Sequence, residues 1–135
     1  MIIWIASYPK SGNTWVRSFL TAYYFCNNGI FDINKLNLIE DYPNKQFFKE
    51  KVNQGEIHKH WETSQKDIRD QKKVKFLKTH NSLITAFGND FTKPEYSLGV
   101  IYIIRDPRNV ITSVKNHNDL DSYDEAFKFM KDENK

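Results

Sequence analysis

Residues 7–15 of this chain read SYPKSGNTW, and the segments on either side predict a turn from a strand into a helix. Residues 2–6 (IIWIA) form a short apolar run with β-branched and aromatic side chains, which is typical of a buried strand. After Thr14 the apolar residues recur at spacings of three and four as far as Cys26, which predicts a helix. We expect this helix to end near Gly29 and Cys26 to be a core residue.

The turn carries groups that bind anions. Backbone N–H groups converge at a helix N-terminus and carry partial positive charge, which favours phosphate or sulfate. Gly12 lets the backbone approach a ligand closely, Lys10 adds a full charge, and Ser11 and Thr14 supply hydroxyl donors. The expected ligand is a phosphate-like anion, and the alternative is an ordinary strand-turn-helix with a surface lysine.

The nucleotide-binding P-loop, GxxxxGK[ST], is a competing interpretation, because Lys10 and Ser11 could be its last two residues. Its glycines would then stand at positions 4 and 9, which hold Trp4 and Pro9. This frame therefore fails. A small P-loop kinase is disfavoured for a second reason, since no carboxylate for Mg²⁺ follows a strand in the usual context.

A second strand-to-helix junction follows residues 99–104 (GVIYII), whose continuous apolar character predicts a central parallel strand covered on both faces. Asp106 is a good N-cap for a helix over residues 107–117. Arg105 would then lie at the carboxyl end of a central strand, where open α/β sheets bind ligands. Ser113 lies about two turns along the helix, and a guanidinium with a hydroxyl makes a sensible phosphate clamp.

The other segments complete an alternation of strands and helices. They comprise loops and a short helix over residues 30–55, an exposed helix over 56–72, a strand over 74–77, a short helix over 81–87 and an amphipathic helix over 119–135. Strands that alternate with helices predict an α/β fold, with a central parallel sheet in a three-layer α/β/α domain. The 135-residue length favours one domain over residues 1–135.

Composition narrows the class of protein. With 27% charged and 39% hydrophobic residues, the chain is typical of a soluble globular protein, and its net charge of +3 does not indicate nucleic-acid binding. Cys26 is the only cysteine, which excludes an intrachain disulfide and favours the cytoplasm. No apolar run is long enough to span a membrane, and no signal peptide is recognisable. No cluster near the loops has the spacing of metal ligands.

Three segments of the chain together resemble the sulfotransferase family. Residues 8–15 look like that family's loop for the 5′-phosphosulfate of 3′-phosphoadenosine 5′-phosphosulfate (PAPS), with Asn13 where the family commonly has Thr. Arg105 and Ser113 look like the pair that holds the 3′-phosphate. Residues 78–80 (KTH) resemble the family segment whose histidine is the catalytic base.

The resemblance implies a fold like that of P-loop NTPases. It also implies a sulfotransferase activity. PAPS would donate a sulfuryl group to a small-molecule hydroxyl or amine acceptor, without a metal. His80 would take the acceptor proton, a task for which histidine is well matched near neutral pH. Lys10 and Lys78 would stabilise the developing negative charge. The residues expected to bind the donor are Lys10, Ser11, Gly12, Asn13, Thr14, Trp15, Arg105 and Ser113.

The family domain is considerably longer than this chain. Its adenine contacts and its basic, glycine-rich closing segment have no counterpart among these residues. We therefore expect either a fragment that lacks the C-terminal half or a minimal member. An open sheet edge in such a chain would favour a homo-oligomer. The alternative function is a truncated or degenerate module that binds a nucleotide or phosphate without turnover.

Overall fold

The computed structural model describes residues 1–48 and 52–132. Its main sheet is parallel and has the strand order β2-β3-β1-β6. The strands are β1 (Ile2–Ser7), β2 (Glu40–Asp41), β3 (Lys75–Thr79) and β6 (Ser97–Ile103), and a separate hairpin holds β4 (Thr85–Ala86) and β5 (Asn89–Asp90). The helices are α1 (Asn13–Phe25), α2 (Trp61–Asp70), α3 (Pro107–His117) and α4 (Tyr123–Lys131). Three 3-10 helices connect them, η1 (Ile33–Leu38), η2 (Lys45–Phe47) and η3 (Gln54–His60).

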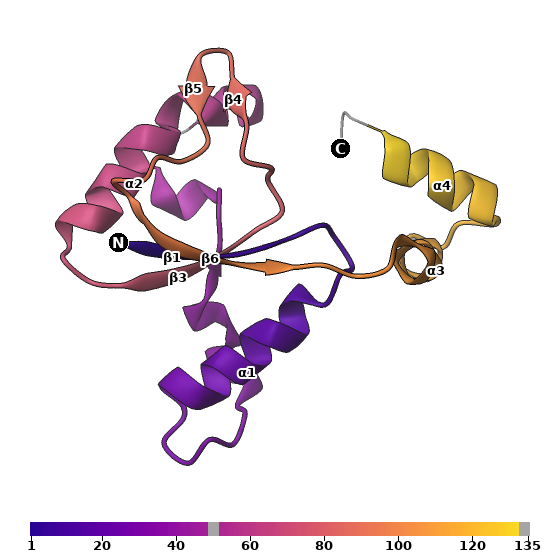
Figure 1. Cartoon of the computed structure of the whole chain (residues 1–135), viewed down its shortest axis with the longest axis horizontal. Helices are drawn as coiled ribbons and strands as arrows, with labels where there is room; N and C mark the ends of the chain where they lie inside the picture. The colour runs from indigo at the N-terminus through magenta and orange to yellow at the C-terminus, as the bar shows by residue number, and fades with distance from the viewer. Residues whose placement is uncertain (49–51, 133–135) are drawn as a thin grey trace.

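The elements form three layers. Figure 1 shows α1 on one face of the sheet and α2 on the other, whereas α3 and α4 lie together beyond the end of β6. Val110 and Val114 of α3 are buried against Ala126 of α4, in a small core of their own. The predicted α/β fold with a central parallel sheet is therefore confirmed.

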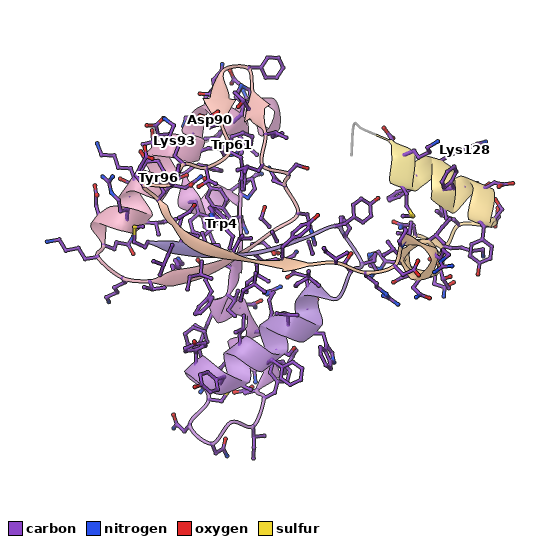
Figure 2. The ribbon with its side chains drawn as sticks, viewed as in Figure 1. Trp4, Trp61, Asp90, Lys93, Tyr96 and Lys128 are labelled. Atoms are coloured by element: carbon purple, nitrogen blue, oxygen red, sulfur yellow. The ribbon has the colours of Figure 1, made fainter. Side chains whose placement is uncertain are left out.

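The main core lies between the sheet and α2. Figure 2 shows Trp4 and Trp61 on this side of the sheet. The ring centroid of Trp4 lies 5.3 Å from those of Tyr42 and Phe91, and its Nε1 donates to Ser97 Oγ at 2.8 Å. Because β1 is the strand that contributes Trp4 and also pairs with both β3 and β6, this core holds the middle of the sheet and, with it, the loop that follows β1.

Helix α1 turns its polar side to the protein. Asn13, Arg17 and Thr21, at spacings of four, are its buried residues. The predicted helix is present, but it ends at Phe25 and not near Gly29. Its apolar stripe from Trp15 is exposed and Cys26 is only half-buried, so the expected core role of Cys26 is wrong. The cause is polar anchoring, because Arg17 donates to the carbonyl oxygens of buried backbone around η1 and fixes which side of α1 faces inward.

Strand β6 lies at an edge of the sheet, so the predicted central position is wrong. It pairs with β1 on one side, and no strand within residues 1–48 and 52–132 pairs with the other. Val100 and Tyr102 are 61% and 65% exposed. An apolar run predicts a strand through its side chains, but the position of a strand in a sheet depends on which other strands are present.

The predicted short helix over residues 81–87 is also wrong, because the chain forms the β4–β5 hairpin there. Phe87 and Gly88 have φ angles of 50° and 79°, which make the turn, and Thr85 Oγ1 donates to Asp90. The helix expected over 56–72 is divided into η3 and α2, and α2 buries one face. The parts of the expected segments 30–55 and 119–135 at residues 49–51 and 133–135 lie outside the described residues.

Candidate functional site

A cavity of about 1050 Å³ lies where β1, β3 and β6 end. One wall is the loop between β1 and α1, a second comes from the residues after β3, and α3 and α4 provide the remainder. The carboxyl ends of parallel strands meet at one edge of a sheet, which is the usual ligand-binding edge of this architecture. The three segments singled out in the sequence therefore converge on one space.

The loop before α1 presents unpaired backbone donors to this cavity. Lys10 and Gly12 have left-handed φ angles of 65° and 105°, and Ser11 N donates to Tyr8 O at 3.2 Å. The first intrahelical bond runs from Val16 N to Gly12 O, and no side chain caps the helix. The N–H groups of the first turn of α1 thus remain available, and its first turn contains no acidic residue. This geometry fits a bound anion.

The side chains of the loop differ in their environment. Lys10, Gly12, Asn13, Thr14 and Trp15 line the cavity, whereas Ser11 is buried and is not part of the lining. Trp15 is 69% exposed, so it is not a core residue. Lys10 forms no ion pair with any residue in 1–48 or 52–132, so its charge is available to a ligand.

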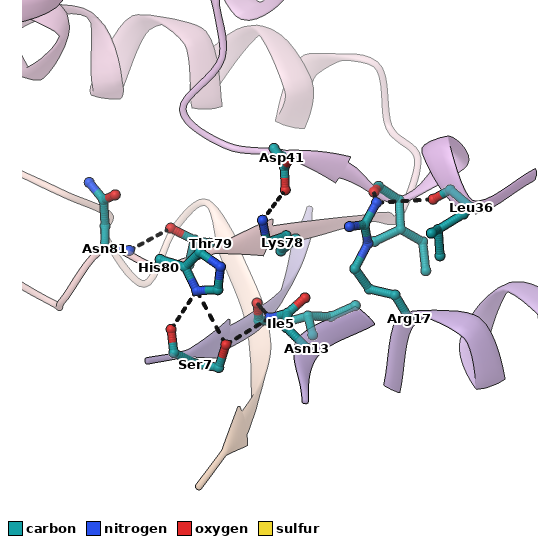
Figure 3. A network of polar contacts seen from close by, with 11 residues as sticks. Ile5, Ser7, Asn13, Arg17, Leu36, Asp41, Lys78, Thr79, His80 and Asn81 are labelled. Carbon is teal, nitrogen blue, oxygen red and sulfur yellow. Dashed lines mark hydrogen bonds and ion pairs between the residues drawn. The ribbon is translucent and has the colours of Figure 1, made fainter. Parts of the chain in front are cut away.

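Asn13 attaches the start of α1 to β1. Its Nδ2 donates to Ile5 O and to Ser7 Oγ, both at 3.1 Å, and the side chain is buried (Figure 3). Its Oδ1 is also buried and has no hydrogen-bond partner in the described part of the chain. The side-chain amide therefore fixes the turn before α1 against β1.

His80 is held in a single orientation by β1. Its Nδ1 lies 2.7 Å from Ser7 O and 3.3 Å from Ser7 Oγ (Figure 3). A carbonyl oxygen only accepts hydrogen bonds, so Nδ1 carries the proton and Nε2 keeps its lone pair. Burial lowers the pKa of His80, and the Ser7 carbonyl opposes that effect while the Lys78 charge adds to it. A lowered pKa favours the neutral form of the imidazole, in which Nε2 is unprotonated.

Lys78 lines the same cavity but already has a partner. Its Nζ lies 2.8 Å from Asp41 Oδ1, and Asp41 stands beside Lys78 in the register of β2 and β3. The two lysines predicted to act in catalysis thus differ, because Lys10 is unpaired among the described residues and Lys78 is neutralised.

Arg105 and Ser113 are not brought together. Arg105 lines the cavity, and its Nη1 donates to Lys10 O at 3.0 Å, which links the end of β6 to the loop. Ser113 is half-buried and is not among the lining residues. Burial of Val110 and Val114 against α4 sets the rotation of α3, so that Val114 faces the cavity.

Other cavity residues have no role in the sequence interpretation. Tyr8 Oη donates to Met130 O at 3.2 Å and connects the loop to α4, and burial raises the pKa of the Tyr8 hydroxyl. Asn81 and Ser82 line the cavity directly after His80. Their position next to the KTH segment is a usable signal, whereas the Tyr8 contact joins residues far apart in the sequence and leaves no local pattern.

Two absences hold for the described part of the chain. No group of three or more His, Cys, Asp or Glu side chains there is placed to hold a metal ion. None of its helices combines the length and apolar character needed to cross a membrane.

The chain was compared with models of protein families. The family model described as a sulfotransferase domain matches residues 2–134, which includes the loop, the KTH segment and both residues of the predicted phosphate clamp. No curated protein and no solved structure matches the chain significantly.

Proposed function

Because this chain belongs to the sulfotransferase domain family, we propose that it transfers a sulfuryl group from PAPS to a hydroxyl or amine acceptor, with His80 as the general base. One observation carries the proposal. An anion-binding turn, two lysines, an arginine and an oriented neutral histidine meet at a single cavity. Anion recognition and proton removal are the two tasks that such a transfer requires.

The residues present fit the donor. The N–H groups of the first turn of α1 suit the 5′ end, where charge is highest, and so does Lys10, which has no ion-pair partner among the described residues. Arg105 suits the 3′-phosphate, because a guanidinium forms bidentate charge-assisted hydrogen bonds with phosphate. When bound, PAPS would supply the sulfuryl group and would leave as adenosine 3′,5′-bisphosphate. Ser113 does not line the cavity, so its predicted contact with the 3′-phosphate has no support from this arrangement.

His80 would act on the acceptor. Its Nδ1 hydrogen bond to Ser7 O leaves Nε2 as the atom that takes the proton of an attacking hydroxyl or amine. Lys10 and Lys78 are the cations placed to stabilise negative charge on the oxygens of the transferred group. In this proposal the wall of the cavity would supply a base and two cations for the transfer.

A second candidate function is a nucleotide-binding or phosphate-binding module without turnover. The position of Ser113 outside the cavity favours it, because the 3′ clamp is incomplete in this arrangement. Both functions predict nucleotide binding, so only a measurement of transfer separates them.

Transfer from radiolabelled PAPS to a panel of alcohols and amines tests the proposal. We expect labelled product and a kcat/KM that is constant above the pKa of His80 and falls as the pH drops through it. Because burial lowers this pKa, the acidic limb should have an apparent pKa below the ordinary value of about 6.5. Nucleotide binding with no product on any acceptor would instead support the non-catalytic module.

A further inference from the structure

Strands β2 and β3 are joined by two ion pairs that occupy different surroundings. Lys75 Nζ lies 2.5 Å from Glu40 Oε2, and Lys78 Nζ lies 2.8 Å from Asp41 Oδ1. Lys75 lies over the ring of Phe47, away from the anion cavity, whereas Lys78 lines that cavity. The chain therefore contains one ion pair at the site and a matched ion pair outside it.

The backbone on both sides of Asp41 is held in place by hydrogen bonds. Tyr42 N donates to Lys78 O at 2.8 Å, which fixes β2 against β3 just after Asp41. The buried Arg17 donates to Leu36 O at 3.2 Å and to Ile39 O at 2.6 Å, which fixes the segment that leads into β2. Figure 3 shows the Asp41–Lys78 pair with His80 on one side of it in this view and Arg17 on the other. The backbone of Asp41 therefore has a fixed place beside Lys78, and the contact of its carboxylate with Lys78 Nζ is the part that a ligand can replace.

A carboxylate at this position needs an explanation, since it repels the anion that the cavity is built to bind. The exposed fractions of the two side chains differ, since Lys78 is 18% exposed and Asp41 is 54% exposed. A half-buried ammonium is costly without a counter-ion. Asp41 supplies that counter-ion when no nucleotide is bound, and a phosphate or sulfuryl oxygen can replace it.

We propose that Asp41 is a positioning residue that serves as the exchangeable counter-ion of Lys78. A nucleotide that binds must therefore break the Asp41–Lys78 ion pair and contact Lys78 in its place. This inference rests on the proposed function. The exchange weakens the binding of the bisphosphate product as well as that of the donor. Asp41 therefore promotes nucleotide release, a step that limits turnover in many enzymes.

Asp41 also acts on His80 through charge. The charged groups around the imidazole come from several elements, namely Lys78 on β3, Asp41 on β2, Arg17 on α1, and Lys10, Arg105 and Asp132 around the cavity. The Asp41 carboxylate raises the pKa of His80 and opposes the effect of the Lys78 charge. Its removal should therefore lower that pKa, an effect that a purely structural role for Asp41 would not produce.

The test compares Asp41→Asn with Glu40→Gln by calorimetry with adenosine 3′,5′-bisphosphate at low salt. Both substitutions remove one carboxylate from β2 and keep the side-chain shape, so thermal unfolding reports any shared structural cost. We expect Asp41→Asn to tighten binding by about three- to tenfold and Glu40→Gln to leave it unchanged. The gain should disappear when Lys78→Met is added, and Asp41→Glu should restore the wild-type affinity.

The results separate the inference from the proposed function. If wild-type protein does not bind the bisphosphate, the proposed function fails and the inference fails with it. If wild-type protein binds but Asp41→Asn binds equally or more weakly, only the inference is overturned. The same holds if the gain survives in the Lys78→Met background. A shift of the acidic limb of the pH–rate profile to lower pH in Asp41→Asn supports the inference.

Discussion

Replacement of His80 by Ala is expected to reduce sulfuryl transfer by about 10²- to 10⁴-fold, the usual contribution of a positioned general base. Affinity for adenosine 3′,5′-bisphosphate should stay within about twofold of wild type, because burial lowers the pKa of His80 and favours its uncharged form. The effect should appear in kcat, since the imidazole acts on the acceptor proton in the transition state. Steady-state kinetics together with calorimetry on the same preparation measure both quantities.

Two other histidines provide the comparison. His58 lies on η3, where its ring is 5.0 Å from that of Phe87, and it does not line the cavity. His58→Ala should therefore leave transfer unchanged. His117 does line the cavity, from α3. If His117→Ala abolished transfer and His80→Ala did not, the base would be His117 and the assignment of His80 would be wrong.

Replacement of Arg105 by Ala is expected to weaken bisphosphate binding by about 10- to 100-fold, because a charge-assisted contact to phosphate is lost. Arg105 has a second task, since its Nη1 donates to Lys10 O and supports the loop. A direct contact between Arg105 and the 3′-phosphate is therefore recognised by comparing two nucleotides that differ only in that phosphate. Affinity for adenosine 5′-phosphate, which lacks the 3′-phosphate, should fall much less than affinity for the bisphosphate.

Arg108 is the matched control for Arg105. It lies three residues further on, is 89% exposed, and pairs with Asp106 at 2.6 Å. Arg108→Ala should leave both nucleotide affinities unchanged. An equal loss of both affinities in Arg105→Ala would mean that Arg105 acts only by supporting the loop, and the predicted contact to the 3′-phosphate would then be wrong.

Local patterns in the sequence predict the parts of the site that are local in the structure. The strand before the loop, the left-handed Gly12 and the start of α3 at Pro107 each depend on a few neighbouring residues. For the same reason the three motifs can be placed at strand ends without coordinates. Their convergence follows from the parallel sheet, because β1, β3 and β6 all end at one edge.

Contacts between residues far apart in the sequence determine which face of each helix is buried, and local sequence patterns do not predict this. The apolar stripe of α1 from Trp15 predicts a buried face, yet Arg17 and its distant carbonyl partners turn the opposite side inward. The rotation of α3 depends on α4, which determines whether Ser113 or Val114 faces the cavity. The Asp41–Lys78 pair arises from the register of β2 and β3, and no short sequence motif predicts it.

The apolar run in β6 shows a second limit. Its composition predicts a strand with both faces covered, while the described chain leaves Val100 and Tyr102 exposed at the sheet edge. Apolar side chains indicate that burial would be favourable, but they do not say which element covers them.

The choice of nucleotide tests the proposed function most directly. Calorimetry with wild-type protein should compare adenosine 3′,5′-bisphosphate with ATP and Mg²⁺ under the same buffer and salt. The loop, Lys10 and Arg105 suit a ligand with phosphates at both ends of the nucleoside. We therefore expect the bisphosphate to bind more tightly, with no requirement for Mg²⁺. Tighter binding of ATP with Mg²⁺ would contradict the proposal of a PAPS-dependent sulfotransferase.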